Sequence, residues 1–159
     1  MKNSVGQIMQ LGGNLILLRV EALQGMFEKV NKVLGAGGGL VWYIAGRGAG
    51  RSMAKVFQTR FREGENPAAV FDKIAWLYAS WGWGRMEIVG SGKNSDRFFI
   101  RIYDNAFVTE QHSQTPSCHF VRGFIEGLLE TLTGIHATSE ETKCMAKGNH
   151  HCEFQITLK

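Results

Sequence analysis

Apolar residues recur at helical spacing in three parts of the chain. This spacing predicts one helix over residues 19–34, a second over residues 67–80 and a third over residues 117–133. Gly123 and Gly127 lie inside the third helix, where each lowers helix propensity by about 1 kcal/mol relative to alanine. We therefore expect another backbone to pack closely against these two glycines.

Other segments have patterns that are typical of strands. A polar, glycine-bearing loop joins residues 85–89 to residues 97–103, which predicts an antiparallel hairpin. After Gly134 the chain predicts a strand, a turn and a last strand with alternating Phe154 and Ile156. The expected class is α/β (mixed α+β), in which helices pack on an antiparallel sheet.

The N-terminal third has a less regular pattern. Residues 1–14 are expected to form an arm or hairpin that leads to a short strand at residues 15–18. The apolar run at residues 40–45 is rich in aromatic and branched side chains and predicts a buried strand, and a further helix is expected over about residues 51–61.

The glycine-rich segment between that strand and that helix superficially resembles a nucleotide-binding loop. A dinucleotide fingerprint would need glycine at Arg51, and a phosphate-binding loop would need lysine at Arg51 and its first glycine at Ala45, one position before Gly46. Both templates fail. A structural strand-to-helix turn is the favoured interpretation of residues 46–52.

Length and composition indicate the number of domains and disfavour some classes of function. We expect the 159 residues to form a single domain, with its core at about residues 15–159. No apolar run approaches the roughly 18 residues that a membrane span needs. The net charge of +4 is not gathered into a basic stripe, so direct nucleic-acid binding is not expected. The absence of a basic, apolar leader favours a cytoplasmic location.

All three cysteines lie in the C-terminal part, and with one carboxylate they are a candidate metal site. The proposed ligands are Cys118, Glu141, Cys144 and Cys152. Thiolates are the preferred ligands of zinc, which takes four ligands in a structural site. Cys118 precedes an apolar helix, where the helix dipole favours a thiolate, and Cys144 and Cys152 are equally distant from Gly148. Glu141 stands three residues before Cys144, so both can bind only where the backbone is irregular.

The residues alone leave alternatives open at this site. The cysteines could be buried small hydrophobic residues, whereas a disulfide is disfavoured by their odd number. His150 and His151 compete with Glu141 as the fourth ligand because imidazole is intrinsically the better zinc ligand.

Aromatic side chains are dense between residues 76 and 103, which indicates a pocket for a small apolar or aromatic molecule. Core packing explains most single aromatic residues, and we expect two or three of the following to reach a cavity. The candidates are Trp81, Trp83, Phe99, Tyr103 and Phe124.

Three stretches of the C-terminal part closely resemble the 4-vinyl reductase domain family, the predicted hydrocarbon-binding domains. These stretches are residues 120–129, 141–148 and 151–154, and weaker glycine signatures extend the resemblance to about Leu15. In the zinc-containing sensor domains of aromatic-responsive transcription activators, which belong to this family, three cysteines and one glutamate hold zinc. The offsets of 23, 3 and 8 residues between the four candidate ligands are similar, which favours Glu141 over the histidines.

The resemblance implies a fold like the ligand-binding fold of nitric oxide sensors and transport-particle subunits, a homodimer, and an apolar pocket beside the zinc segment. The leading hypothesis is a domain that binds or senses a small hydrophobic or aromatic molecule and contains a structural zinc. A signalling partner protein would then be needed, unless the domain is part of a longer regulator. The alternatives are a reductase or accessory factor acting on the vinyl group of a tetrapyrrole, and a scaffold or tethering subunit. An enzyme is less favoured because no flavin, nicotinamide or iron–sulfur motif is present.

Overall fold

A computed structural model describes residues 16, 18–58, 67–90, 96–108 and 116–159. The arm expected at residues 1–14 and most of the strand expected at residues 15–18 lie outside these residues. Ile16 and Leu18 are described and belong to no helix or strand.

Among the described elements, helices come first in the chain, and two pairs of strands separated by one further helix follow. In chain order they are α2 (Val20–Leu34), a short 3-10 helix (Gly35–Gly37), α3 (Gly38–Phe57), α4 (Pro67–Ser80), β1 (Arg85–Val89), β2 (Arg97–Tyr103), α5 (His119–Thr133), β3 (Ala137–Lys143), a second 3-10 helix η3 (Met145–Lys147) and β4 (Cys152–Leu158). The mixed α+β class, the three predicted helices and the predicted hairpin are confirmed. No helix in the described ranges combines the length and the apolar character that crossing a membrane would need.

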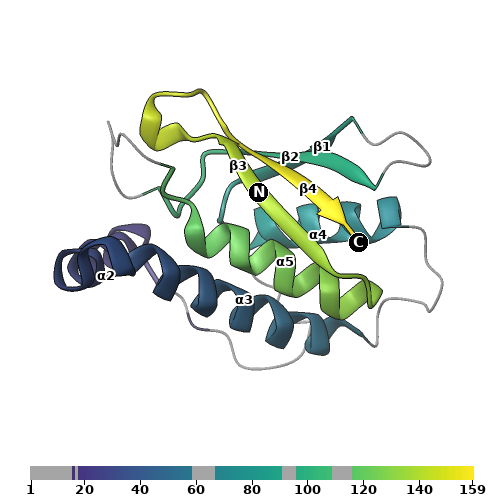
Figure 1. Cartoon of the computed structure of the whole chain (residues 1–159), viewed down its shortest axis with the longest axis horizontal. Helices are drawn as coiled ribbons and strands as arrows, with labels where there is room; N and C mark the ends of the chain where they lie inside the picture. The colour runs from purple at the N-terminus through teal and green to yellow at the C-terminus, as the bar shows by residue number, and fades with distance from the viewer. Residues whose placement is uncertain (1–15, 17, 59–66, 91–95, 109–115) are drawn as a thin grey trace.

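One antiparallel sheet of four strands, in the order β1-β2-β4-β3, forms the upper layer of the molecule (Figure 1). α4 and α5 lie beneath the sheet, α3 lies beneath α5, and α2 extends from one end. The inner face of the sheet supplies much of the core, because its alternating side chains are almost fully buried; these include Phe98, Ile100, Ile102, Phe154 and Ile156.

The strand predicted at residues 40–45 is wrong, because this segment is the first part of α3. The glycine-rich segment 46–52 is the middle of the same helix and not a turn between a strand and a helix. The helix expected at residues 51–61 is the second half of α3 as far as Phe57, and residues 59–61 lie outside the described part. Strand propensity failed here because tertiary contacts decide the conformation of such a segment.

Those tertiary contacts are made by glycines on α3 and α5 that let the two backbones touch. A Cβ atom at Gly46 would overlap the carbonyl oxygen of Phe120, and one at Gly50 would overlap that of Phe124. On α5, a Cβ at Gly123 would overlap the carbonyl oxygen of Tyr43. Gly127 meets the Arg47 carbonyl oxygen in the same way. The close approach expected at Gly123 and Gly127 is therefore confirmed, with α3 as the partner.

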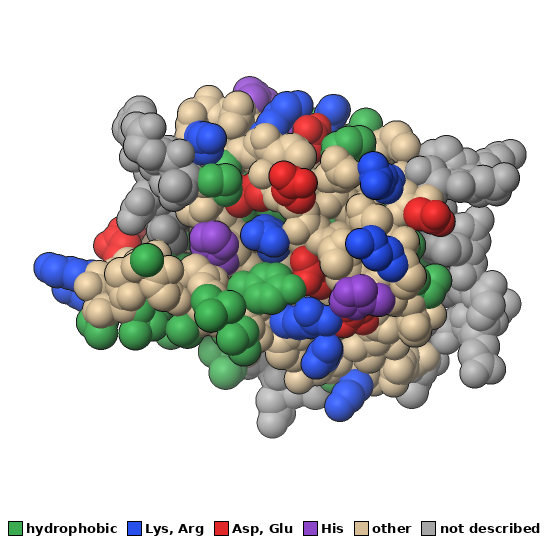
Figure 2. Space-filling model, viewed as in Figure 1, with side chains coloured by type: hydrophobic (Ala, Val, Ile, Leu, Met, Phe, Trp, Pro, Cys, Tyr) green, Lys and Arg blue, Asp and Glu red, His purple; other side chains and the backbone are tan. Residues whose placement is uncertain are grey.

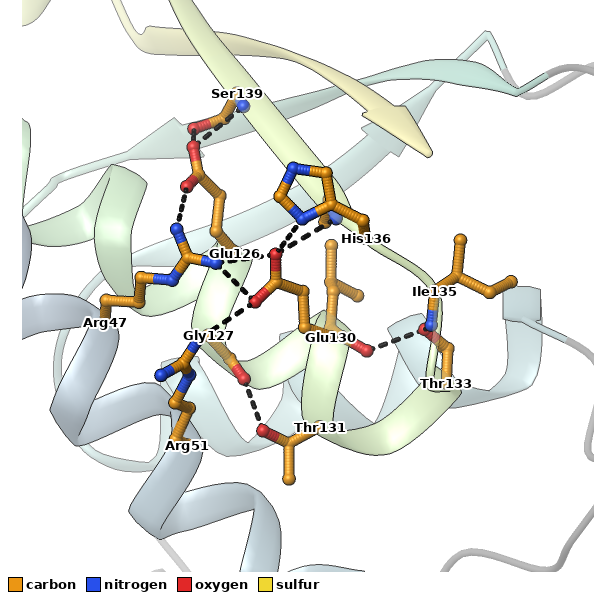
Figure 3. A network of polar contacts seen from close by, with 12 residues as sticks. Arg47, Arg51, Glu126, Gly127, Glu130, Thr131, Thr133, Ile135, His136 and Ser139 are labelled. Carbon is orange, nitrogen blue, oxygen red and sulfur yellow. Dashed lines mark hydrogen bonds and ion pairs between the residues drawn. The ribbon is translucent and has the colours of Figure 1, made fainter. Parts of the chain in front are cut away.

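A polar network beside the glycines connects α3, α5 and β3 (Figure 3). Arg47 of α3 donates to both carboxylate oxygens of Glu130, at 2.7 and 2.6 Å, and lies 3.8 Å from Glu126. The buried Glu126 accepts from the N–H and the hydroxyl of Ser139 in β3, at 2.8 and 2.7 Å. Burial alone would raise the pKa of Glu130, but hydrogen bonds from Arg47 and from the N–H of Ala137 lower it, so this carboxylate is ionised at neutral pH.

A second polar cluster covers the outer face of the sheet, where Glu153 is the central residue. Arg101 donates to Glu153 at 2.7 Å, Lys143 at 3.3 Å, and the Thr142 hydroxyl at 3.1 Å. Burial acts to raise the pKa of Glu153, but these donors hold it at about 2. The outer face is thus stabilised by charge pairing, whereas the inner face is apolar.

The glycine contact predicts a sharp difference between two substitutions in α3. Gly46→Ala should lower the free energy of unfolding by roughly 2 kcal/mol or more, because the added methyl meets backbone that no rotamer change can move. Gly48→Ala is the matched control, since a Cβ there meets nothing within 4 Å and the exposed position should gain about 0.5–1 kcal/mol of helix propensity. Denaturant unfolding measures both, and equal stabilities would contradict the proposed close contact.

Candidate metal centre and aromatic cluster

The four predicted ligands converge at one buried point. One ligand atom from each of Cys118, Glu141, Cys144 and Cys152 lies within 4.8 Å of all the others. The Cys118 sulfur is 3.4 Å from the Cys152 sulfur and 3.9 Å from the Cys144 sulfur. All three cysteines are free and at most 1% exposed.

Three local features of the chain bring these residues together. Cys118 is the N-cap residue of α5, and Cys152 begins β4. A register shift between Glu141 and Lys143 in β3 supplies the irregular backbone that the odd spacing of Glu141 and Cys144 requires. The chain then turns through η3 to Gly148, whose φ of 87° favours glycine.

Hydrogen bonds hold the cluster in place from outside. The Glu141 Oε2 accepts from the N–H of Cys118 at 3.1 Å, at the positive end of α5. The Asn105 side-chain nitrogen lies 3.4 Å from the Cys118 sulfur and 3.5 Å from the Cys152 sulfur, and the Met145 N–H donates to the Cys152 sulfur at 3.4 Å. The Glu141 Oε1 is buried and has no hydrogen-bond partner among the described residues.

The four acidic groups strongly perturb one another. Burial and then the contact with Cys144 raise the pKa of the Glu141 carboxyl to about 8. The pKa of the Cys118 thiol is raised because this thiol donates toward the sulfurs of Cys144 and Cys152, and the pKa of Cys144 is lowered because its sulfur accepts. A divalent cation among these groups would favour the ionised form of all four.

This geometry fits a tetrahedral metal ion. Zinc–sulfur bonds of about 2.3 Å place neighbouring sulfurs about 3.8 Å apart, close to the 3.9 and 3.4 Å from the Cys118 sulfur to those of Cys144 and Cys152. The partnerless Oε1 of Glu141 has a lone pair available, and leaving such a buried acceptor unsatisfied costs about 1–3 kcal/mol. The donor set of three sulfurs and one carboxylate oxygen therefore suits zinc, and zinc at this site remains a prediction from the sequence.

The two competing histidines lie outside this group of donors. His150 is exposed, and its ring is 6.0 Å from the Tyr103 ring. The His151 Nε2 lies 3.7 Å from Glu153 on the outer side of the sheet.

Three of the five predicted pocket residues lie together in an aromatic cluster on the inner side of the sheet. Trp83 is its centre, with ring centroids 5.0 Å from Trp81 and 5.1 Å from Phe124. The cluster continues through further ring contacts to Tyr78, Phe107, Phe120, Phe27 and Trp42.

The other two predicted pocket residues lie on the opposite face of the sheet. Phe99 and Tyr103 alternate with the buried Phe98 and Ile102, and Tyr103 packs beneath the guanidinium of Arg85 at 4.1 Å. The structure therefore does not bring Phe99 and Tyr103 together with Trp81, Trp83 and Phe124.

Sequence reasoning missed the roles of Tyr78 and Asn105. Tyr78 is fully buried beside Trp83, and its hydroxyl has no hydrogen-bond partner within the described part of the chain. Burial, and then the nearby Cys118 and Cys152, raise the pKa of Tyr78 well above its ordinary value, so the hydroxyl stays protonated. Tyr78 stands four residues after the buried Ile74 on α4, a helical spacing that would have indicated its burial, whereas no local pattern marks Asn105.

The chain is similar to a known family and to curated proteins. The family model of the 4-vinyl reductase domain matches residues 98–158, which include all four predicted metal ligands. The bacteriochlorophyll synthase 23 kDa chain of Cereibacter sphaeroides is 32% identical over 92 residues, which are 58% of this chain and 42% of that protein. The chain thus spans less than half the length of that relative.

Solved structures share the fold at low sequence identity. The phenol-responsive sensory domain of the transcription activator PoxR, solved with phenol, has a TM-score of 0.79 at 18% identity, covering 92% of this chain and 77% of that one. Trafficking protein particle complex subunit 3 of Naegleria fowleri, covalently bound to palmitic acid, has a TM-score of 0.67 at 17% identity, covering 88% and 95%. An H-NOX protein from S. oneidensis has a TM-score of 0.62 at 14% identity, covering 91% and 78%. The expected likeness to nitric oxide sensors and transport-particle subunits is confirmed for the fold.

Proposed function

We propose that this chain, whose residues 98–158 match the 4-vinyl reductase domain family, binds a small hydrophobic or aromatic molecule and holds a structural zinc beside that binding site. The observation that carries the proposal is the position of Tyr78. Its hydroxyl is buried and has no hydrogen-bond partner among the described residues, and Tyr78 lies near both the Trp83 ring and the thiols of Cys118 and Cys152. Such a group is the expected polar contact of an otherwise apolar pocket.

Zinc would be held by Cys118, Glu141, Cys144 and Cys152. Four protein ligands leave no open position for water, so the ion would supply structural cross-linking and not chemistry. The site would tie the N-terminus of α5 to both ends of the β3–β4 connection. Free thiols persist in a reducing compartment, and we place the protein in the cytoplasm for this reason.

The small molecule would lie among the rings of Trp81, Trp83 and Phe124. Proteins of the same fold support this assignment, since PoxR was solved with phenol and the trafficking subunit with palmitic acid. One bound molecule is aromatic and the other aliphatic, so the fold accommodates both kinds of apolar compound. A sensing role would also require a partner protein that reads the bound state.

The family resemblance implies a homodimer, and one surface of the chain has the apolar character of a dimer interface. Exposed hydrophobic side chains gather along α2 and the adjoining part of α3 (Figure 2); they include Val33, Leu34, Leu40, Val41 and Ile44. A contiguous apolar surface is typical of protein interfaces. We propose that a second copy of the chain covers this surface.

Two other functions each have one supporting observation. The likeness to the bacteriochlorophyll synthase 23 kDa chain favours a role in tetrapyrrole metabolism, as a reductase or accessory factor. The exposed apolar surface of α2 and α3 would equally suit a scaffold or tethering subunit. A tetrapyrrole-binding protein should bind a vinyl-bearing tetrapyrrole more tightly than phenol, and a scaffold should bind neither.

The zinc site can be tested by elemental analysis. We expect about one zinc per chain in protein prepared without chelators, and loss of most of it in Cys144→Ser or Cys152→Ser. Glu141→Ala should weaken zinc retention at least about 10-fold, since even outer contacts of zinc contribute that much. His151→Ala is the control and should retain zinc. If His151→Ala lost more zinc than Glu141→Ala, the fourth zinc ligand would be His151 and not Glu141.

Ligand binding can be followed through tryptophan fluorescence during titration with phenol and with toluene. Both should change the emission of the wild-type protein, and Trp81→Ala should abolish binding. Trp76→Ala is the matched control, because Trp76 is 48% exposed and outside the ring contacts described above. Tyr78→Phe should weaken phenol roughly 10-fold, the effect of one lost hydrogen bond, and leave toluene unchanged. Equal effects on both compounds would contradict the role of the Tyr78 hydroxyl.

The dimer surface can be tested by light scattering after size-exclusion chromatography. Wild-type protein should have the mass of two chains, and Ile44→Glu should have the mass of one. Val56→Glu places the same charge at another exposed apolar position of α3 and should leave the dimer intact. A wild-type monomer, or equal behaviour of both variants, would contradict this interface.

A further inference from the structure

The segment that follows β2 touches both the sulfur cluster and the aromatic cluster. Asn105 is its central residue and is only 5% exposed. The side-chain nitrogen lies within hydrogen-bonding distance of the sulfurs of Cys118 and Cys152, at 3.4 and 3.5 Å. The side-chain oxygen accepts from the N–H of Phe107 at 3.1 Å, so neither end of this amide is left unpaired.

The same segment is fixed to the aromatic cluster by its backbone and by one ring. The N–H of Ala106 donates to the carbonyl oxygen of Trp83 at 3.1 Å. The Phe107 ring lies 4.8 Å from the Trp83 ring, edge to face, and stacks on Phe120 at 4.7 Å. A shift of Asn105 would therefore move Trp83 and Phe107 as well.

The negative charge of the proposed metal centre can be offset by the side-chain N–H groups of Asn105. Three thiolates and one carboxylate carry four negative charges, and a divalent cation neutralises only two of them. The centre would thus be buried with a net charge of −2, which is unfavourable unless N–H groups point at the sulfurs. The N–H of Met145 donates to the Cys152 sulfur, and the side-chain nitrogen of Asn105 is positioned to donate to the sulfurs of Cys118 and Cys152.

We propose that Asn105 is a positioning residue of the metal centre, which stabilises two of the thiolates and fixes them relative to Trp83. The inference rests on the proposed zinc site and goes beyond it, because it assigns a residue that is not itself a ligand. It also names the physical connection between the metal centre and the aromatic cluster. Trp83 should consequently report on the occupancy of the metal site.

The test compares Asn105→Leu with wild-type protein that is loaded with zinc or cobalt. Leucine has nearly the size of asparagine but cannot donate to sulfur. We expect zinc transfer to a chromogenic chelator to become about 10- to 100-fold faster, the usual range for outer contacts of zinc. We also expect the sulfur-to-cobalt charge-transfer band to move to longer wavelength, because a thiolate without a donor gives up its electron more easily.

Asn149→Leu is the matched control. Asn149 is also beside the cluster, but its side-chain oxygen accepts from the N–H of Cys144, and among the described residues no hydrogen bond joins its side chain to a sulfur. This variant should leave the cobalt band unchanged. Zinc loading should alter the tryptophan emission of the wild type and of Asn149→Leu, and should alter it less in Asn105→Leu. Trp83→Phe should remove the emission change and so identify Trp83 as its source.

The possible results separate this inference from the proposed zinc site. If the wild-type protein takes up no zinc, the metal site itself fails, and the role of Asn105 fails with it. If the wild type is loaded but Asn105→Leu has an unchanged chelator rate and cobalt band, only the role of Asn105 is overturned. Should Asn105→Leu not fold, Asn105→Ala removes the same donor without added apolar bulk, and an unchanged cobalt band in that variant would again overturn the proposal.

Discussion

The direct contact between the backbones of α3 and α5 is the constraint on which the remaining structure depends. Two glycines on each helix, four residues apart, remove the side chains that would otherwise separate the helices. α5 is thereby held between α3 on one side and the sheet on the other (Figure 1). Its N-terminus carries Cys118 and its buried side carries Phe124, so the candidate metal centre and the aromatic cluster both take their positions from this contact.

The glycine contacts alone do little to fix the position of α3 along the axis of α5. The polar network fixes this position. Arg47 lies between Gly46 and Gly50 in sequence and reaches both Glu126 and Glu130 on α5. Because Glu126 also accepts from Ser139, the same network positions β3, which contains Glu141. An ion pair of this kind contributes modest stability but strongly disfavours a slipped arrangement, in which charges would be buried without partners.

Sequence reasoning succeeded where local pattern and tertiary role agree. The spacing of Phe120, Phe124 and Leu128 predicted α5, and the alternation of Phe98, Ile100 and Ile102 predicted β2. It failed in α3, because residues 40–45 carry strand-like composition while Gly46 and Gly50 act through contacts with a helix more than 70 residues away. The candidate metal ligands follow from spacing and family resemblance together, since spacing alone does not distinguish Glu141 from the histidines. Alternation already placed Phe99 and Tyr103 opposite the core face of β2, whereas the role of Asn105 depends on approaches between distant segments that no local pattern encodes.

The backbone irregularity in β3 joins the two surfaces of the sheet at a single place. On the inner surface it lets Glu141 and Cys144 converge, although a regular strand would direct them to opposite sides. On the outer surface it presents Thr142 and Lys143 to Glu153. A force that straightened the strand from the solvent side, for example a partner that competed for Glu153, would withdraw a donor from the buried centre. A binding event on the solvent-facing side of the sheet would therefore change the positions of the donor atoms on its buried side.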